Sequence, residues 1–160
     1  MIRKAILNDA GDIAAIYNYY VENTVITFET GPLSVKEMLD RILTVSRTYP
    51  FLVYEASGEI AGYCYASPWK KREAYRHTVE STVYITRSAQ DRGIGASLMQ
   101  ALIEELKGMS VHAIIACIAL PNPQSTGFHG KLGFRQVSCF QEVGYKFDRW
   151  IDVGDWELIL

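Results

Sequence analysis

Three β-rich runs follow one another in the middle of the chain, with no helical pattern between them. They are Phe51–Ala56, Ile60–Ala66 and Thr78–Thr86, and each is rich in β-branched or aromatic residues. The residues between the first two, Ser57-Gly58-Glu59, are typical of a hairpin turn. A doubly wound nucleotide-binding fold alternates strands with helices. The consecutive strands therefore exclude that fold and predict a sheet that is at least partly antiparallel.

Apolar residues at helical spacing predict two helices before these strands. A first strand is expected over Ile2–Leu7, and Asn8 or Asp9 can cap the helix that follows. The apolar face of that helix comprises Ile13, Ile16, Tyr17, Tyr20 and Val21. Ser34 and Glu37 form a capping box at the start of the second helix. Its apolar face comprises Val35, Met38, Leu39, Ile42 and Leu43.

The second half of the chain adds two helices and three strands. A third helix has an apolar face made of Ile94, Leu98, Leu102 and Leu106. The nearly apolar run Val111–Leu120 is typical of a strand buried on both faces, as in a parallel pairing. Asn122-Pro123 predicts the start of a fourth helix, and Gly133 fits its left-handed end. Residues 134–143 and 150–160 are predicted to be closing strands around a turn-prone 144–148.

The predicted element order is β-α-α-β-β-β-α-β-α-β-β. This order indicates an α/β fold with a mixed sheet and helices on both faces. The chain has 160 residues and no internal repeat, linker or low-complexity tract. We therefore expect a single domain over residues 1–160.

Composition excludes several classes of function. The formal net charge is −2, so a nucleic-acid footprint is not expected. The three cysteines, Cys64, Cys117 and Cys139, are odd in number and far apart, which disfavours a disulfide framework. The three histidines are scattered, so no metal site is expected. Since Val111–Leu120 is too short to cross a bilayer, we expect a soluble, cytoplasmic protein without a membrane partner.

The stretch Ser88–Leu98 places two glycines, Gly93 and Gly95, directly before a predicted helix. It lacks the lysine of a phosphate-binding Walker loop, and Leu98 occupies the third glycine position of a dinucleotide fingerprint. Unpaired N–H groups at a helix N-terminus nevertheless attract anions, and glycines allow a phosphate to approach them. The residues alone leave two alternatives, an anion site or an ordinary glycine turn.

Two motifs give the chain a resemblance to the GNAT superfamily of N-acetyltransferases. Gln90-Asp91-Arg92-Gly93-Ile94-Gly95 matches the superfamily's acetyl-CoA motif, Q/R-x-x-G-x-G/A. A second motif, N-x-x-S/A-x-x-x-Y-x-x-x-G-F, is matched from Asn122 to Phe134, with His129 where tyrosine is usual. The resemblance implies the GNAT-type sheet, which is mixed, mostly antiparallel and twisted, with helices on both faces.

Within that superfamily, the chain is similar to the phosphinothricin and methionine sulfoximine acetyltransferases over nearly its whole length. The similarity is most distinctive at Thr78–Tyr84 (TVESTVY) and at Gly144–Lys146 (GYK). It implies transfer of an acetyl group from acetyl-CoA to the α-amino group of a small acidic amino-acid analogue. It also implies a homodimer.

The resemblance assigns three regions to acetyl-CoA. The backbone of one strand would hold the pantetheine arm, the glycine loop would hold the pyrophosphate, and the start of the fourth helix would bind near the pantetheine amide. These cofactor-binding residues are Val83, Tyr84, Ile85, Gln90, Asp91, Arg92, Gly93, Ile94, Gly95, Ala96, Asn122 and Ser125.

Acetylation of an amine needs a group that accepts the amine's proton. At the reference pKa of an α-amino group, only about a tenth is neutral at pH 7. Glu80 interrupts a Thr/Val-rich strand, where a buried carboxylate is costly unless it is functional or hydrogen-bonded. We interpret it as the candidate base, with a surface glutamate on an edge strand as the alternative. His129 is interpreted as a general acid toward the leaving thiolate, as a second base, or as a helix-surface residue.

The basic loop Ser67–His77 is the expected acceptor lid. Cations and hydrogen-bond donors suit a substrate with a carboxylate and a phosphinate or sulfoximine group. The expected substrate-binding residues are Glu73, Ala74, Tyr75 and Arg76. Residues 27–32 are expected to form another wall, where Glu29 occupies a position at which a basic residue is expected in phosphinothricin enzymes. Two alternatives to this function stay open: a GNAT enzyme for a different small amine, and a non-catalytic acetyl-CoA-binding module.

Overall fold

The computed structural model describes residues 1–160, and their contacts group into two compact units. Unit 1 comprises Met1–Asn18, Leu33–Ser67 and Ser81–Ser110. Unit 2 comprises Tyr19–Pro32, Pro68–Glu80 and Val111–Leu160. Strand β4 (Thr78–Ile85) contributes to both, because the boundary follows Glu80. The expectation of a single domain over 1–160 stays a prediction.

The strands of unit 1 are β1 (Ile2–Lys4), β2 (Phe51–Ala56), β3 (Glu59–Pro68) and the last five residues of β4, in that spatial order. β1 pairs antiparallel with β2, and β2 pairs antiparallel with β3. The predicted hairpin is confirmed: its two-residue turn, Ser57-Gly58, has φ values of 53° and 82°. Two positive φ values are the signature of the turn type that matches strand twist.

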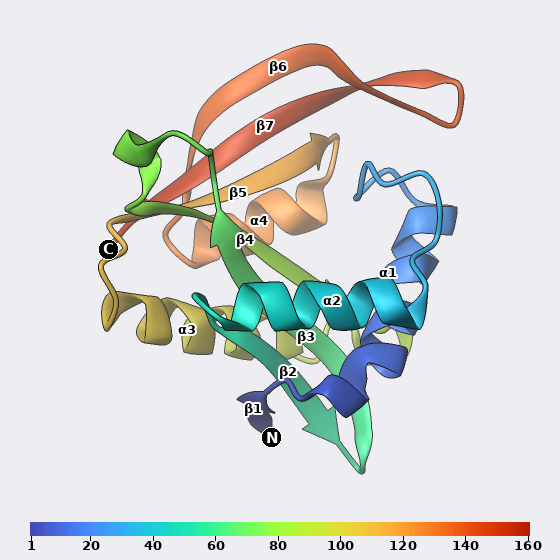
Figure 1. Ribbon diagram of the computed structural model, residues 1–160. Coiled ribbons are helices and arrows are strands. Elements are labelled where there is room, and N and C mark those ends of the chain that lie inside the picture. The colour runs from blue at the N-terminus through green and yellow to red at the C-terminus, as the bar shows by residue number, and fades with distance from the viewer. The chain divides into compact units, whose positions relative to one another are not determined.

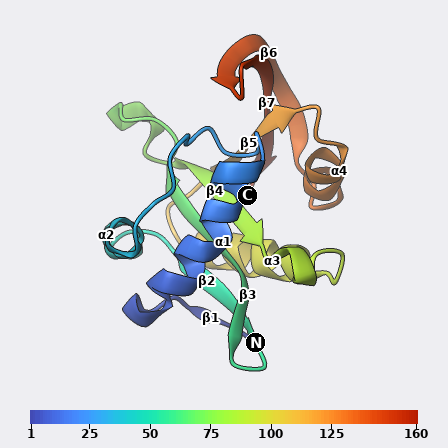
Figure 2. The same cartoon turned by 90° about the vertical axis from the view of Figure 1, so that its right-hand side faces the viewer.

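Helices α1 (Ala10–Asn23), α2 (Val35–Ser46) and α3 (Ile94–Lys107) accompany these strands. Both α2 and α3 contact β2, and they lie on opposite faces of the strands (Figures 1 and 2). The predicted faces of α1 and α3 are buried throughout, with Ile13 and Leu98 fully inaccessible. The capping box of α2 is confirmed, since Ser34 Oγ accepts the Glu37 N–H at 3.2 Å and Glu37 accepts the Ser34 N–H at 2.7 Å.

Two sequence predictions for unit 1 are wrong in extent. The first strand ends at Lys4, because a 3₁₀ turn begins at Leu7 and the Asp9 carboxylate accepts the Ile6 N–H at 2.8 Å. Asp9 also receives two hydrogen bonds from the Arg3 guanidinium, at 2.8 and 2.9 Å. In α2 only Met38 and Ile42 are buried, while Val35 and Leu43 are exposed. The buried stripe of α2 is therefore narrower than the predicted face.

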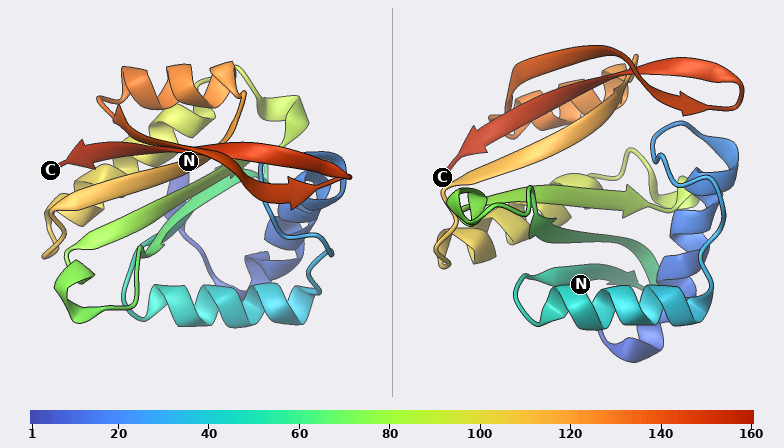
Figure 3. Two further views of the ribbon diagram at one scale, coloured as in Figure 1. Left: turned by 90° about the horizontal axis from the view of Figure 1, so that it is seen from above. Right: turned by 45° about the horizontal axis from the view of Figure 1, so that its top comes forward.

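Unit 2 is built on the first three residues of β4 with β5 (Ala113–Leu120), β7 (Arg149–Ile159) and β6 (Arg135–Lys146), in that spatial order. β4 runs parallel to β5 from Thr78 to Glu80. The β5–β7 and β7–β6 pairs are antiparallel (Figure 3). The mixed, mostly antiparallel sheet is therefore confirmed. Helix α4 (Pro123–Lys131) connects β5 to β6.

The closing hairpin is longer than the sequence predicts. Its turn is only Phe147-Asp148, with φ values of 51° and 55°, so β6 and β7 extend into the predicted turn region. The start of α4 is confirmed, since Asn122 Oδ1 accepts the Ser125 N–H at 3.0 Å and Pro123 is the first helical residue. Gly133 has a φ of 94°, as a left-handed helix end requires. None of the helices has the length and apolar character that a membrane span needs.

Candidate active site

The N-terminus of α3 in unit 1 is shaped to receive an anion. Gly93 is the N-cap residue with a φ of 75°, and no side chain hydrogen-bonds to the cap. A Cβ built on Gly93 would meet no heavy atom within 4 Å, so the space before the helix is open. The first N–H groups of a helix have no intrahelical acceptor, and the helix dipole favours negative charge there. The loop therefore has room and hydrogen-bond donors for a phosphate group. This favours the anion site over the ordinary glycine turn, the two alternatives that the sequence left open.

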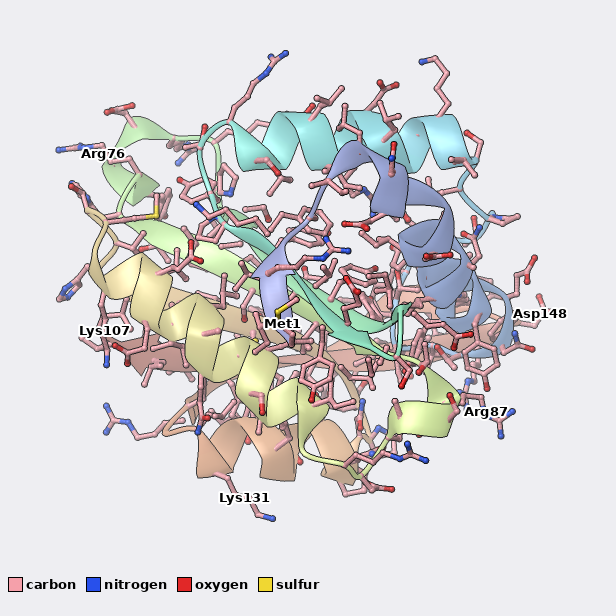
Figure 4. All side chains as sticks on the ribbon, turned by 90° about the horizontal axis from the view of Figure 1, so that it is seen from below. Met1, Arg76, Arg87, Lys107, Lys131 and Asp148 are labelled. Carbon is pink, nitrogen blue, oxygen red and sulfur yellow. The ribbon has the colours of Figure 1, made fainter.

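Arginines flank this loop in the sequence. Arg87 begins the 3₁₀ turn that leads into it, and Figure 4 shows its side chain extending outwards from that turn. Arg92 is exposed directly before Gly93. Asp91 adopts a φ of 61°, which turns the chain toward the helix. The loop therefore combines open backbone donors with two cationic side chains, a combination that suits a doubly charged pyrophosphate.

The second half of β4 carries the residues predicted to contact the pantetheine arm. Its ladder with β5 ends at Glu80, and residues 81–85 belong to unit 1, beside β3. The Tyr84 ring packs against Tyr17 and Tyr63, with centroids 5.2 and 5.7 Å away. A Cβ on Gly62 of β3 would come within 2.9 Å of the Tyr84 carbonyl oxygen, so glycine permits close strand contact there. The half-buried Tyr84 ring is thus packed against other aromatic side chains, and a ligand role would fall to its backbone.

Glu80 lies at the last paired position of β4 in unit 2, on a face that also carries Cys117 and Asp155. Glu80 pairs with Ile115 of β5, Cys117 follows two residues later, and Asp155 of β7 pairs with Cys117. Directly paired residues, and residues two apart, project from the same face of a sheet. Burial raises the pKa of the Glu80 carboxyl, and the charge of Asp155 raises it further. Glu80 is therefore a stronger proton acceptor than an exposed glutamate.

The segment Tyr19–Pro32, which is the end of α1 and the loop after it, is fastened to the far end of the β6–β7 hairpin of the same unit (Figure 1). The buried ammonium of Lys146 donates a hydrogen bond to the Thr27 carbonyl oxygen at 2.8 Å. The Phe28 ring lies directly over Gly144, where a Cβ would clash with it. Burial lowers the pKa of Lys146, and the nearby Glu29 carboxylate opposes that shift. Glu29 and Phe28 are thus held in place over this end of the sheet.

His129 is buried on α4 in a defined tautomer. Its Nδ1 lies 2.9 Å from the Ser125 carbonyl oxygen, which can only accept, so Nδ1 carries a hydrogen. Phe128 and Phe134 contact the imidazole edge to face, at centroid distances of 4.8 and 5.2 Å. Burial lowers the pKa of His129, and the hydrogen bond to Ser125 partly opposes this. At neutral pH the ring is therefore uncharged, with a lone pair on Nε2. This arrangement favours a proton acceptor over a proton donor.

Asn122, Ser125 and His129 are connected by local hydrogen bonds at the start of α4. Ser125 gives its N–H to the Asn122 side chain, and its carbonyl oxygen accepts from His129. Asn122 Oδ1 is therefore used as a cap, which leaves its amide NH₂ group for a ligand. Asn122, Ser125 and His129 are thus linked in series along the first two turns of α4.

The loop 68–77 holds its side chains in two groups. The Lys70 ammonium lies 4.0 Å from the Trp69 ring centroid and 5.3 Å from that of Tyr75, which meet edge to face. The Lys70 ammonium is therefore held over two aromatic rings. Arg76 Nη1 lies 3.7 Å from Glu73 Oε1, and both side chains are exposed. Figure 4 shows Arg76 at the outer edge of the loop, pointing away from the ribbon.

Sequence reasoning did not identify Asp155, Cys117 or Lys146 as members of this region. Each is a polar residue in a strand, and the residues directly before and after it are largely apolar or buried. This local signal is weak, because a polar residue in a strand ordinarily faces solvent. Their association depends on the pairing of β5 with β7 and β7 with β6.

Comparisons with known proteins place this geometry among acetyltransferases. The family model described as an acetyltransferase (GNAT) domain matches residues 2–154. A phosphinothricin N-acetyltransferase of Streptomyces viridochromogenes is 37% identical over 156 residues, covering 98% of this chain and 85% of that protein. An L-methionine sulfoximine/L-methionine sulfone acetyltransferase of Pseudomonas aeruginosa is 37% identical over 161 residues, covering 99% and 94%. The crystal structure of a phosphinothricin acetyltransferase from Sinorhizobium meliloti in complex with AcCoA superposes with a TM-score of 0.96. It is 33% identical and covers 100% of this chain and 88% of that one.

Proposed function

The chain belongs to the GNAT acetyltransferase family and is an acetyl-CoA-dependent N-acetyltransferase, and we propose that its acceptor is the α-amino group of a small amino-acid analogue. Phosphinothricin and methionine sulfoximine are the acceptor types that the names of its relatives suggest. The observation that carries the proposal is Glu80, a half-buried strand carboxylate whose surroundings raise its affinity for a proton.

The proposed donor site joins the first turn of α3 to the backbone of β4. The open N-terminus at Gly93 would hold the pyrophosphate, together with the flanking residues Gln90–Ala96. The backbone of Val83–Ile85, in the same unit, would hold the pantetheine arm. In unit 2, Asn122 is a separate candidate for binding acetyl-CoA, with its amide NH₂ group as the donor. Ser125 would support Asn122 through the cap. Acetyl-CoA would supply an activated acetyl group, so no covalent intermediate on the protein is required.

In the proposed mechanism Glu80 accepts a proton from the acceptor's ammonium group, either directly or through a water. The nitrogen then bonds to the acetyl carbon, the bond from that carbon to sulfur breaks, and the nitrogen loses a second proton to the thiolate. Glu80 suits its step because its raised pKa lies closer to that of the ammonium than an ordinary glutamate's would. The neutral His129, with its lone pair on Nε2, would relay the second proton.

We propose that the acceptor's carboxylate and side chain are bound by the loop 68–77 and by the loop fastened through Lys146. Glu73, Ala74, Tyr75 and Arg76 form one exposed turn, in which Arg76 would exchange its partner Glu73 for the acceptor carboxylate. The exposed ion pair costs little to break, because such pairs contribute about 0–1 kcal/mol. Phe28 would provide an apolar wall for the acceptor's methylene groups.

Thiol release from acetyl-CoA tests the proposal directly. We expect phosphinothricin or methionine sulfoximine to be acetylated with a kcat/KM at least about a hundredfold above that for a polyamine or an alanine-starting peptide. Each contact between acceptor and protein that these amines lack costs about 1–3 kcal/mol. Mass spectrometry of the product would locate the acetyl group on the α-nitrogen. Preference for the polyamine or the peptide would identify a different acceptor. Binding of acetyl-CoA without thiol release for any amine would identify a non-catalytic module.

Glu29 is expected to select against an anionic acceptor side chain. It lies beside Lys146 and offsets the cation that an anionic phosphinate would otherwise meet. Glu29→Gln should therefore raise the ratio of kcat/KM for phosphinothricin to that for methionine sulfoximine by about fivefold, or about 1 kcal/mol at surface-like dielectric. The ratio is measured by competition between the two acceptors. Glu22→Gln, which removes an exposed carboxylate from α1, is the matched control and should leave the ratio unchanged. An unchanged ratio in Glu29→Gln would contradict the assignment.

A further inference from the structure

We propose that Asp155 is a positioning residue of the acetyl-transfer site, which acts through Glu80 and keeps that carboxylate a strong proton acceptor. The inference rests on the proposed function, since it takes Glu80 as the base. It concerns a residue that the sequence motifs do not include.

The strand register brings Asp155 and Glu80 to one face of the unit 2 sheet. Glu80 pairs with Ile115, and Asp155 pairs with Cys117, two residues further along the same strand. Glu80 is on β4 and Asp155 is on β7, so the two residues lie on opposite sides of β5. Adjacent strands are about 4.8 Å apart. Cys117 lies between them, and no bulge interrupts the β5–β7 ladder from Ala113 to Leu120. The arrangement is therefore fixed by backbone pairing.

Two neighbours hold the Asp155 carboxylate in place. Ser138 Oγ donates a hydrogen bond to Asp155 Oδ2 at 2.9 Å and accepts the Asp155 N–H at 3.0 Å. On the other side, the Cys117 thiol hydrogen-bonds to Asp155. Although Cys117 is exposed by its surface area, desolvation of the thiol, this hydrogen bond and the charges of Asp155 and Glu80 raise its pKa to about 12. The thiol therefore stays protonated, acts as a donor and adds no competing negative charge. Asp155 is thus a carboxylate held in place on the face of the sheet that also carries Glu80.

Other charged or titratable groups also lie on this face of the sheet. Glu157 also pairs with Ile115, so the register places it across β5 from Glu80, and Arg135 of β6 is the residue paired with Glu157 on its other side. Cys117 is the titratable group contributed by β5 beside Glu80. Of these groups, Asp155 is the one whose charge acts on Glu80 and, after burial, disfavours its ionised form. A carboxylate near another carboxylate binds its proton more tightly.

The test is the titration of Glu80 in Asp155→Asn. Carboxyl NMR of the protein labelled at glutamate, with the Glu80 signal assigned from Glu80→Gln, reads the titration without any acceptor. We expect the Glu80 titration to move to lower pH in Asp155→Asn. The acid limb of the kcat/KM profile should move in the same direction. At the plateau, kcat should fall by about threefold with KM nearly unchanged, because a weaker base accepts the proton less readily. Asp155→Glu, which keeps the charge, should restore both values.

Glu157→Gln is the matched control, since it removes one carboxylate from the same strand and the same face and should leave the Glu80 titration in place. Asp155→Ser provides a second neutral variant in case asparagine prevents folding. A Glu80 titration that is the same in wild type and in the neutral Asp155 variants would overturn the inference. That result is distinct from failure of the proposed function, which would appear as no acetylation of any acceptor by the wild-type enzyme.

Discussion

Glu80→Gln is expected to lower kcat/KM at pH 7 by about a hundredfold or more, the usual contribution of a general base. The glutamine side chain keeps the shape of glutamate but cannot accept a proton. Only the neutral acceptor could then react, which at pH 7 is about a tenth of an ordinary α-amine and so accounts for about tenfold. The lost assistance to proton transfer in the reaction step accounts for the rest. The dissociation constant for acetyl-CoA should not change, because Glu80 is not among the residues proposed to bind acetyl-CoA.

The pH dependence separates this role from a structural one. In the wild type, activity should be lost as pH falls through the pKa of Glu80, which burial and then Asp155 raise above the ordinary value of 4.5. In Glu80→Gln that limb should disappear, and kcat/KM should rise about tenfold per pH unit up to the pKa of the amine. Steady-state kinetics between pH 5 and 10 measures both profiles. Two superimposable profiles of equal height would remove Glu80 as the base.

Thermal unfolding provides the control for folding. A carboxyl whose pKa is higher in the folded than in the unfolded protein stabilises the fold at low pH, and this contribution is lost as pH rises through the folded pKa. Ionised Glu80 therefore destabilises the folded protein at pH 7. Glu80→Gln should have a Tm at pH 7 no lower than that of the wild type. Glu59→Gln, at an exposed position of β3, should leave both the Tm and the kinetics unchanged.

The sequence predicts the elements of this fold well wherever local interactions determine them. The capping box at Ser34, the hairpin turn at Gly58 and the cap at Asn122 each depend on residues within a few positions of one another. The predicted end of the first strand is wrong, because the Asp9 carboxylate binds the Arg3 guanidinium and the Ile6 N–H, and the strand stops at Lys4. The closing turn was placed too broadly, since Phe147 and Asp148 adopt positive φ without glycine.

The candidate site was predictable only where the same local rules apply. The glycine loop is a short segment before α3, and Ser125 and His129 are one helical turn apart, so in both cases neighbours in the sequence are neighbours in space. The association of Asp155 with Cys117 requires the register of two strands that are 38 residues apart in sequence (155 − 117). The hydrogen bond from Lys146 to Thr27 spans 119 positions. Local propensity contains no information on such pairings, which depend on the assembled sheet.

Gly93→Val is expected to raise the dissociation constant for acetyl-CoA about thirtyfold or more, equivalent to about 2 kcal/mol. A valine side chain would enter the open space before α3, where the pyrophosphate is proposed to lie against the N–H groups. It would also strain the backbone, because φ at this position is 75°. Gly58→Val separates the two effects, since Gly58 has a φ of 82° and equally open surroundings but lies in the β2–β3 turn. Titration calorimetry with acetyl-CoA should show weakened binding for Gly93→Val and wild-type binding for Gly58→Val. Equal affinities in the two variants would mean that the glycine at the start of α3 serves the turn alone, and that the pyrophosphate is bound elsewhere.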